Sequence, residues 1–549
     1  MSFVLYESNR SYMSYSTHGY IINNVTLPIN ASQKEAFTIA AKKLRSVGIN
    51  SKECDFSIYK RSVDARKKND IKFVYSVLVS GELPSVPEDK LKSSGISLHS
   101  YSDPCFKPGD EKLESGVAVV GSGPCGLFAA LLLAENGYKP VLIERGGSVA
   151  ERNESIEKFK QTRRLDCDTN IQFGAGGAGT FSDGKLVTRV NDSMSTYVLK
   201  RFVEFGAPEE ILYLAKPHIG TDILSVVVEN MINRITELGG KVMYHTRFID
   251  YKTSGSRITG IVTNNGIIDC SALVLAIGHS ARDTYGTLIE RGFDIVAKPF
   301  SVGMRIEHST DIIDRGMYGD LAGDKHLGHA EYNLSYNTKE RGVYTFCMCP
   351  GGTVVAAASE EGGVVVNGMS AHARDGRNSN SAVCCSIFKE DYGSDPRSAI
   401  EYQRRIERGA FIAGGSDYSA PIITVGDFLC GRCSTEPTEI LPTYMDGKGV
   451  RLADPSSYLP AKVVELLRRG LLDFDRKIKG FAYPGAVLTG AETRTSSPLR
   501  IMRNNETRLA TGYDNLYPAG EGAGYAGGIT SAAIDGIYTA IAIINRYRP

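Results

Sequence analysis

Residues 117–145 read VAVVGSGPCGLFAALLLAENGYKPVLIER, and this stretch decides the fold. The apolar run Val117–Val120 predicts a buried parallel strand, residues 127–135 predict a helix, and residues 141–143 predict a second strand. A GxGxxG sequence joins the first strand to the helix. Its glycines permit a tight turn, the approach of a pyrophosphate and close helix–strand packing. The stretch therefore predicts a dinucleotide-binding turn rather than a structural glycine turn.

The residues of this turn are the first group of predicted cofactor contacts. The free N–H groups and partial positive charge of a helix N-terminus favour a phosphate there. The acidic residue that ends the second strand is expected to accept a hydrogen bond from a ribose hydroxyl. The predicted contacts are Gly121, Ser122, Gly123, Pro124, Cys125, Gly126, Glu144 and Arg145.

Composition excludes several classes of protein. The 63 Lys and Arg residues nearly balance 62 Asp and Glu residues, so neither nucleic acid nor an anionic membrane is expected as the main partner. No apolar run reaches the roughly 18 residues of a membrane span, and the N-terminus lacks the pattern of a secretory signal. Eleven scattered cysteines, an odd number, favour a reducing compartment. We expect a cytoplasmic protein, and the sequence leaves its oligomeric state open.

A chain of 549 residues is too long for one core, and its patterns predict four segments. Residues 1–105 predict a small α+β unit of ferredoxin-like type, with strands at 20–27, 56–61 and 71–79 around a helix at 33–47. Within it, the basic segment 60–68 is interpreted as a solvated loop, with a nucleic-acid patch as the alternative. Residues 116–290 and 481–549 predict the two parts of a Rossmann-like α/β domain that is discontinuous in sequence. Residues 291–480 predict a β-rich domain inserted between them.

Further elements are expected within these segments. Strands at 241–245, 258–263 and 273–277 are expected to complete the nucleotide-binding sheet. The inserted domain is expected to hold an antiparallel sheet, with strands at 302–307, 344–348, 353–358 and 363–367, followed by helices at 396–409 and 460–470. The chain is expected to close with a strand at 516–518 and a helix at 528–545.

GxGxxG occurs three times, at residues 121–126, 174–179 and 522–527. Only the first copy lies between a clear strand and a helix with an acid at the expected distance. The second is interpreted as an extended loop, and the third follows a short strand and precedes the last helix. One complete fingerprint predicts one dinucleotide, and no separate nicotinamide-binding domain is visible.

This pattern resembles the large FAD-containing oxidoreductases of glutathione-reductase-like fold. Two later signatures support the resemblance, YPAGEG at 517–522 and LVLAIG at 273–278. Glu521 stands where that group more often has Asp, and Ile277 stands in place of Thr. The resemblance implies FAD as the cofactor, with Glu144 at the adenosine ribose. It also implies contacts from Ile277, Gly278, Gly520 and Glu521.

Other segments resemble a bacterial family of uncharacterised FAD-dependent dehydrogenases with an extra N-terminal domain. The segments are RSVDAR (61–66), GTFSDGKL (179–186), RIEH (305–308), FCMCPGG (346–352), NGMS (367–370) and ETRTSSP (492–498). The similarity spans nearly the whole chain. It implies an FAD-binding domain with an inserted substrate domain, and it leaves the substrate open.

Further cofactor contacts are expected around the flavin and the adenine. The start of the last helix, at Gly528, Ile529 and Thr530, is expected to face the flavin edge that gains negative charge on reduction. Backbone amides and short polar groups of the second glycine loop are expected to line the flavin ring, unless that loop lies on the surface. A strand at 244–247 is expected to pass the adenine. The residues concerned are Gly179, Thr180, Ser182, Asp183, Arg247 and Phe248.

The predicted catalytic residues are Glu492 and Arg494. This pair is able to bind a carboxylate and supply an acid, although a structural salt bridge explains it equally well. His279, which follows the LVLAIG segment, is able to face the cofactor, although a lone histidine is more often structural.

The cysteines suggest two further hypotheses. Cys430 and Cys433 form a CxxC pair in which Arg432 favours a thiolate, although a structural pair is the preferred interpretation. Cys347 and Cys349, with Cys384 and Cys385, lack the spacing of a metal site, so no metal is expected. Strand alternation is expected to put Cys347 and Cys349 on one face, as buried apolar residues.

The sequence therefore predicts an FAD-dependent oxidoreductase that transfers a hydride between an unidentified small-molecule substrate and flavin N5, with NAD(P)H as a transient donor. Two alternatives remain open. One is an FAD-dependent RNA-modifying enzyme, suggested by the basic segment 60–68. The other is a flavoprotein that relays electrons or binds a partner through its N-terminal domain.

Overall fold

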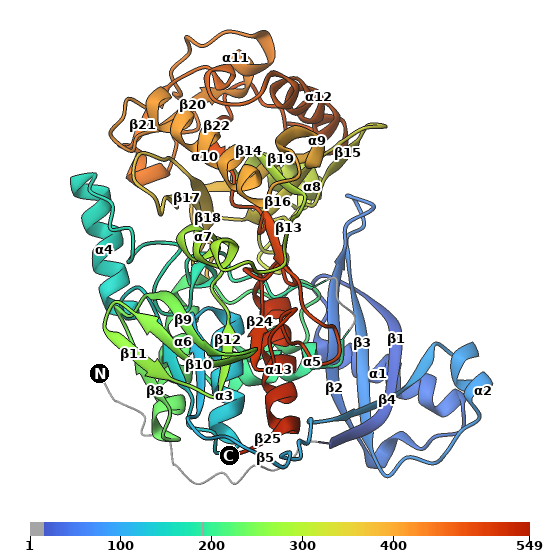
Figure 1. The fold of residues 1–549 in the computed structure, drawn as a ribbon. Coiled ribbons are helices and arrows are strands. Elements are labelled where there is room, and N and C mark those ends of the chain that lie inside the picture. The colour runs from blue at the N-terminus through green and yellow to red at the C-terminus, as the bar shows by residue number, and fades with distance from the viewer. Residues whose placement is uncertain (1–15, 189–191) are drawn as a thin grey trace. The chain divides into compact units, whose positions relative to one another are not determined.

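The structure, a computed structural model, describes residues 16–188 and 192–549, and their contacts divide the chain into two compact units. The smaller unit comprises the described residues up to Phe106 together with Leu212–Ala215. Its elements run β1 (Ser16–Pro28), α1 (Gln33–Ser46), β2 (Cys54–Asp64), β3 (Lys72–Gly81), α2 (Glu88–Ser93) and β4 (Ile96–Ser102). They form an antiparallel sheet in the order β2-β3-β1-β4. This β-α-β-β-α-β connectivity is that of a ferredoxin-like fold (Figure 1).

The core of the small unit follows the periodicity of its sequence. Alternate residues of β3, beginning with Phe73 and Tyr75, are buried, as on a strand with one face toward a core. Helix α1 buries Ala36, Ala40 and Leu44, which lie four residues apart on one face. The prediction of a loop at 60–68 is wrong in its first half, because β2 continues to Asp64 and pairs there with β3.

The larger unit contains a parallel five-stranded sheet. Its order is β24 (Leu516–Pro518), β12 (Ala272–Leu275), β6 (Val117–Val120), β7 (Val141–Ile143) and β8 (Lys241–Met243). Since β24 comes from the end of the chain and pairs with β12, the nucleotide-binding domain is discontinuous, as predicted. Helix α3 (Pro124–Glu135) follows β6 and is apolar on all sides, because it also packs against α6 (Thr221–Glu237) and α13 (Ile529–Arg546).

The strand predicted at 258–263 forms, but not in this sheet. It is β10 (Arg257–Thr263), which joins β9 (Phe248–Ser254) and β11 (Gly266–Asp269) in a separate antiparallel sheet. Antiparallel hairpins need only short turns, whereas a return to a parallel sheet needs a crossover. The remaining elements of this domain are α4 (Val149–Thr162), α5 (Met194–Glu204), α7 (Arg282–Glu290), β5 (Glu111–Lys112) and β25 (Tyr547–Arg548).

The inserted part of the larger unit is built on a mixed seven-stranded sheet. Its order is β15 (Ser335–Asn337), β16 (Gly342–Cys349), β19 (Asn378–Ile387), β14 (Phe300–Ser309), β22 (Val487–Glu492), β20 (Ala420–Thr424) and β21 (Val450–Leu452). The pair β17 (Thr353–Ala356) and β18 (Val366–Met369) stands apart from it. Helices α8 (Thr310–Tyr318), α9 (Lys389–Tyr392), α10 (Pro396–Ala413), α11 (Val425–Cys430) and α12 (Ala461–Lys477) accompany the sheet.

The chain enters and leaves the insert through one short ribbon. Strand β13 (Ile295–Ala297) pairs antiparallel with β23 (Leu499–Ile501). The predicted boundary at residue 480 is too early, because β22 pairs with β14 and β20 inside the inserted sheet.

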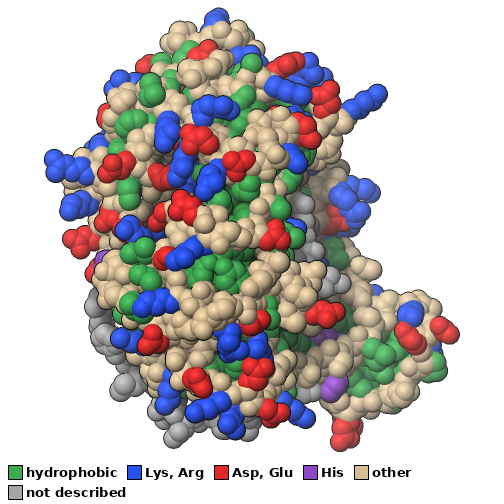
Figure 2. Space-filling view, in the orientation of Figure 1, with side chains coloured by type: hydrophobic (Ala, Val, Ile, Leu, Met, Phe, Trp, Pro, Cys, Tyr) green, Lys and Arg blue, Asp and Glu red, His purple; other side chains and the backbone are tan. Residues whose placement is uncertain are grey.

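No helix in the described ranges is both long and apolar enough to cross a lipid bilayer. On the face seen in Figure 2, basic and acidic side chains are interspersed rather than segregated.

Candidate cofactor and substrate site

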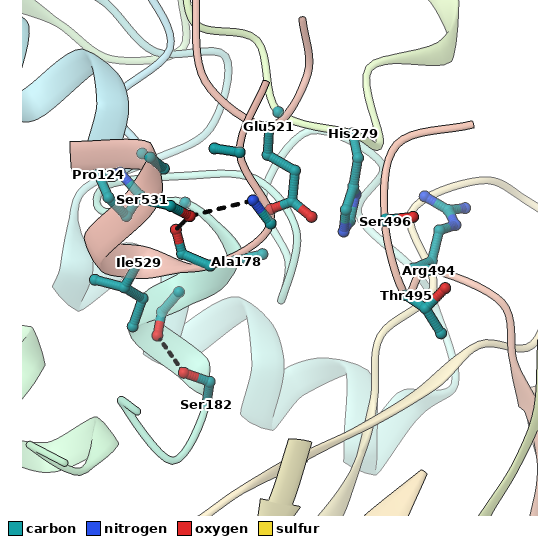
Figure 3. Close-up of a pocket in the computed structure, with 18 of the residues that line it drawn as sticks. Pro124, Ala178, Ser182, His279, Arg494, Thr495, Ser496, Glu521, Ile529 and Ser531 are labelled. Atoms are coloured by element: carbon teal, nitrogen blue, oxygen red, sulfur yellow. Dashed lines mark hydrogen bonds between the residues drawn. The ribbon is translucent and has the colours of Figure 1, made fainter. Parts of the chain in front are cut away.

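A cavity of about 1150 Å³ lies in the larger unit, where both of its parts contribute residues. The nucleotide-binding part supplies the first glycine turn, the second glycine loop and the N-terminus of α13. The insert supplies residues of β16, β18 and β22. Figure 3 shows Glu521 and His279 reaching into the cavity, between the start of α13 on one side and Arg494, Thr495 and Ser496 on the other. The predicted residues that line the cavity are Gly121, Gly123, Pro124, Cys125, Glu144, Arg145, Gly179, Ser182, Asp183, Phe248, Ile277, Gly278, Glu492, Arg494, Glu521, Gly528, Ile529 and Thr530.

Each of the three glycines in the first turn is needed for a different reason. Gly121 has φ +97°, and a Cβ there would lie 2.4 Å from the carbonyl oxygen of Ala276. A Cβ on Gly126 would lie 1.8 Å from the carbonyl oxygen of Gly121, so this glycine lets α3 pack on the strand. A Cβ on Gly123 would meet only Gly177 Cα, at 3.9 Å. Packing and backbone conformation therefore do not require Gly123 to be glycine, and the space that it leaves open belongs to the cavity, where a pyrophosphate could approach the backbone.

Glu144, at the end of β7, has its hydrogen-bonding capacity filled by the protein. Its carboxylate accepts bonds from the N–H groups of Ser122 (3.0 Å), Gly146 (3.0 Å) and Gly174 (2.9 Å), and from the Ser122 hydroxyl (2.7 Å). A carboxylate has about four acceptor positions, and three of these donors are backbone groups that cannot turn away. A ribose hydroxyl would therefore take the place of the Ser122 hydroxyl. Ser122 itself is buried and does not line the cavity.

A buried arginine, which the sequence did not reveal, organises the second glycine loop. Arg152 on α4 donates hydrogen bonds to the carbonyl oxygens of Asn170, Ile171, Ala175 and Gly177. No carboxylate forms a salt bridge with it among the described residues, and burial lowers its pKa to about 10. Backbone carbonyls thus solvate the cation, and in return the cation holds the loop in one conformation. No motif in the sequence indicates this arrangement.

The N-terminus of α13 opens onto the cavity, and Glu521 lies beside it. Gly528 is the N-cap residue, so the first N–H groups of the helix have no partner within it. Burial raises the pKa of Glu521 to about 7, against the opposing effect of Lys298. The cavity therefore holds a helix N-terminus that favours negative charge and a carboxyl group that titrates near neutral pH.

The predicted catalytic residues line the cavity, but each is bound to a different partner. Glu492 accepts two hydrogen bonds from the buried guanidinium of Arg305, at 2.9 and 3.1 Å. Arg494 donates to the carboxylate of Glu407, at 3.0 and 3.1 Å. Arg282 binds the same Glu407 carboxylate, through two bonds of 2.8 Å. Both Glu492 and Arg494 therefore form salt bridges, with partners far away in the sequence. Both residues nevertheless line the cavity.

His279 lies beside these charges and is neutral. Burial, with the neighbouring cations Arg494 and Arg282, lowers its pKa to about 3. Its Nδ1 lies 2.8 Å from the Ser280 hydroxyl. The ring also hydrogen-bonds to the backbone of Arg494, and it lines the cavity.

Several predicted contacts lie elsewhere. Gly126, Thr180, Arg247 and Gly520 do not line the cavity. The Thr180 hydroxyl faces the Ala175 carbonyl, and Asp535 accepts the bond from the Gly520 N–H. Residues 244–247 are not a strand, and the N–H of Arg247 is bound to Asn264. Of the two residues predicted to contact the adenine, Phe248 lines the cavity and Arg247 does not.

A cluster of charged side chains also borders the cavity. Of its members, only Asp183 was among the predicted site residues. Asp183 forms ion pairs with Lys185 and Arg374, and both cations also pair with Glu331. Burial opposes ionisation of Asp183, but Lys185 and Arg374 outweigh it and lower its pKa to about 2. With Lys216 nearby, the cluster holds three cations and two anions. Lys185 lies in the same segment as Asp183, GTFSDGKL at 179–186.

The cysteines divide into two groups. Cys430 and Cys433 are free thiols outside the cavity, and burial and neighbouring carboxylates raise the pKa of Cys433, which argues against the thiolate that Arg432 would favour there. Cys347 lines the cavity, whereas Cys349 is fully buried. The expected alternation is broken, because Cys347 has φ +46° and β16 contains a bulge between Phe346 and Cys349. Among the described residues no group of three His, Cys, Asp or Glu side chains is placed to hold a metal ion.

Comparisons with known proteins agree with the dinucleotide site. Residues 299–495 match a family described as "FAD-dependent protein, C-terminal domain-like", and residues 114–154 match an FAD binding domain. Residues 20–80 match a domain of unknown function. An uncharacterised protein from Clostridium beijerinckii is 46% identical over 533 residues, which are 96% of this chain and 98% of that protein.

Solved structures give weaker likenesses. Glycine oxidase from Bacillus cereus is 12% identical, with 78% of this chain and 97% of that chain covered and a TM-score of 0.34. L-Proline dehydrogenase from P. horikoshii is 14% identical, with 78% and 92% covered and a TM-score of 0.34.

Proposed function

Because the chain belongs to the family of FAD-dependent proteins that includes the Clostridium beijerinckii protein, we propose that it is an oxidoreductase that transfers a hydride between a small-molecule substrate and flavin N5. FAD is its cofactor. The open space at Gly123, the N-terminus of α3 and the acidic residue Glu144 support binding of the ADP half.

One observation carries the proposal: the glycine turn and a polar recess of the insert belong to a single cavity. Its volume of about 1150 Å³ exceeds the roughly 300–1,000 Å³ of an ordinary small-molecule site. This supports a cofactor and a substrate side by side. When bound, FAD supplies hydride chemistry that no side chain offers.

The chain's own residues have separate tasks in this proposal. The N-terminus of α13 stabilises negative charge, and Glu521 holds or releases a proton at its carboxyl group. Arg494 and neutral His279 orient a polar substrate group through hydrogen bonds. The insert lines one side of the recess and so reduces the contact of a bound cofactor with water, although the cavity stays open to solvent.

The test has two steps. Purified protein is first expected to show flavin absorbance, or to acquire it when FAD is added. Its bound flavin is then mixed anaerobically with a library of small metabolites, NADH and NADPH among them, and bleaching of the flavin is followed. Free FAD at equal concentration is the control. We expect at least one compound to reduce bound FAD much faster than free FAD. A protein that takes up no FAD, or whose FAD no compound reduces faster than free FAD, would contradict the proposal.

A further inference from the structure

Two cysteines of β16 lie where a solvent-accessible cavity meets the buried sheet. Cys347 is half-buried and lines the cavity, and Cys349 lies behind it with no exposed surface. The Cys349 thiol donates a hydrogen bond of 3.4 Å to the Cys347 carbonyl oxygen, and each of the two thiols is the largest influence on the pKa of the other. The two sulfur atoms are therefore neighbours, one accessible and one enclosed.

The bulge in β16 makes this proximity possible. In a regular strand, residues i and i+2 are about 6.6 Å apart at 3.3 Å each, near the upper limit of the 4.4–6.8 Å Cα separation in disulfides. Here the register runs from Phe346 opposite Ala382 to Cys349 opposite Asn380, so β16 has one residue more than β19. Together with the positive φ at Cys347, the extra residue bends the strand, so the two cysteines are not held in the extended geometry of a regular strand.

The surroundings favour a thiolate at Cys347. The guanidinium of Arg305 donates a 3.1 Å hydrogen bond to the Cys347 carbonyl oxygen, and Lys185 also lies nearby. The hydrogen bond from Cys349 and these two cations lower the pKa of Cys347, although burial and Glu492 oppose them. The pKa of Cys349 is raised, by its bond to Cys347 and by burial. Cys125 also lines the cavity, but burial raises its pKa strongly.

We propose that Cys347 and Cys349 are a redox-active dithiol that closes to an intrachain disulfide and exchanges electrons with bound FAD. The inference rests on the proposed function for the presence of FAD. In the closing step a bond forms between the two sulfur atoms. The Cys347 thiolate and the Cys349 thiol together lose two electrons and one proton, and oxidised FAD takes up both electrons and the proton. Cys347 is the exchanging thiol, because external thiols and disulfides reach it first.

Peptide mapping tests the disulfide without any activity assay. Cleavage after Arg341 and Arg374 yields peptide 342–374, whose only cysteines are Cys347 and Cys349. The holoprotein is equilibrated with oxidised or reduced glutathione, its free thiols are alkylated, and the peptide is weighed. We expect an unalkylated peptide, lighter by two hydrogen atoms, under oxidising conditions and a doubly alkylated peptide under reducing conditions. The proposal is overturned if both thiols are alkylated under both conditions, or if the peptide is linked to the one that contains Cys384.

Reductive titration tests the exchange with FAD. Oxidised holoprotein is titrated anaerobically with dithionite, and flavin absorbance is followed. We expect native protein to consume two equivalents of a two-electron reductant for each FAD, and the Cys349→Ser variant to consume one, a twofold difference. The Cys430→Ser/Cys433→Ser variant, which changes a pair outside the cavity, is the matched control and is expected to match native protein. Equal consumption by native protein and Cys349→Ser would overturn the exchange.

Failure of this inference differs from failure of the proposed function. Protein without flavin absorbance contradicts the proposed function, and peptide mapping on that protein still tests the cysteine pair. Protein with normal flavin and two permanently free thiols contradicts only the inference.

Discussion

Replacing Gly123 by alanine separates the cofactor role of the glycine turn from its role in the fold. An added Cβ meets nothing nearer than 3.9 Å, and φ at this position is −67°, so the protein alone does not oppose it. Alanine is a poorer N-cap than glycine by roughly 0.5–1 kcal/mol, but it also restricts the unfolded chain, which stabilises the fold by about 0.4–1 kcal/mol. We therefore expect the free energy of unfolding of FAD-free protein to change by less than about 0.5 kcal/mol.

The affinity for FAD is expected to respond very differently to Gly123→Ala. The new methyl group occupies the space through which the pyrophosphate approaches the backbone. Loss of one hydrogen bond from a backbone N–H to a charged phosphate costs about 1.5–3 kcal/mol. This corresponds to a roughly 10- to 150-fold increase in Kd. Titration of FAD-free protein with FAD, followed by flavin fluorescence, measures the Kd, and urea unfolding followed by circular dichroism measures the stability.

Gly126→Ala is the matched control for this experiment. Its Cβ would lie 1.8 Å from the Gly121 carbonyl oxygen, so α3 must move from the strand. We expect this variant to lose about 1–3 kcal/mol of unfolding free energy even without FAD. The reasoning is refuted if Gly123→Ala keeps its FAD affinity within about twofold, or if it destabilises FAD-free protein as much as Gly126→Ala does.

Three further predictions concern ionisable side chains. Glu407→Gln is expected to lower the free energy of unfolding by about 3–5 kcal/mol, because Arg494 and Arg282 lose the carboxylate that they share. Urea unfolding measures this change. A loss below about 1 kcal/mol would contradict a stabilising role of the Glu407 carboxylate. Arg152→Met is expected to cost at least about 3 kcal/mol and to weaken FAD binding, because buried carbonyls of the second glycine loop lose their donor; unchanged proteolytic sensitivity of that loop would argue against this. Glu521 has a folded pKa of about 7, above its ordinary value of 4.5, so it contributes stability that is complete below pH 4.5 and lost as the pH rises through 7. Between pH 4.5 and 8, we expect the unfolding free energy of FAD-free Glu521→Gln to fall by about 1–3 kcal/mol less than that of native protein. The maximum difference is roughly 3.4 kcal/mol, and the expected value is smaller because Glu521 is partly exposed. Parallel pH profiles for variant and native protein would contradict this prediction.

Sequence reasoning was most accurate where the structural cause is local. The turn at Gly121–Gly126, the strand before it and the acid at Glu144 follow from spacings within thirty residues, and the structure has the turn, the strand and the acid at those positions, although Ser122 and Gly126 do not line the cavity. The first strands of the inserted sheet were also recognisable as short apolar runs. Their order was not, because it depends on pairings between distant segments.

The charged part of the site shows the limit of local reasoning. Glu492 and Arg494 were identified as cavity residues, but their partners lie 187 and 87 positions away in the sequence. No motif indicates such a pairing. The bulge at Cys347 is also invisible in sequence, because it exists only relative to the register of β19. Regular alternation therefore predicted a buried apolar pair where the structure has one accessible thiol.

The β13–β23 ribbon has a consequence for protein engineering. Since Ala297 lies opposite Leu499, the two ends of residues 298–498 leave the nucleotide-binding domain side by side. Segments whose ends are close together are the ones that proteins tolerate as insertions. The insert is thus covalently joined to the nucleotide-binding domain at one place, while the ion pairs Arg282–Glu407 and Asp183–Arg374 also link the two parts. Exchanging residues 298–498 between relatives would leave every strand of the parallel sheet and the glycine turn unchanged in sequence, provided that the partners of Arg282 and Asp183 in the insert are kept.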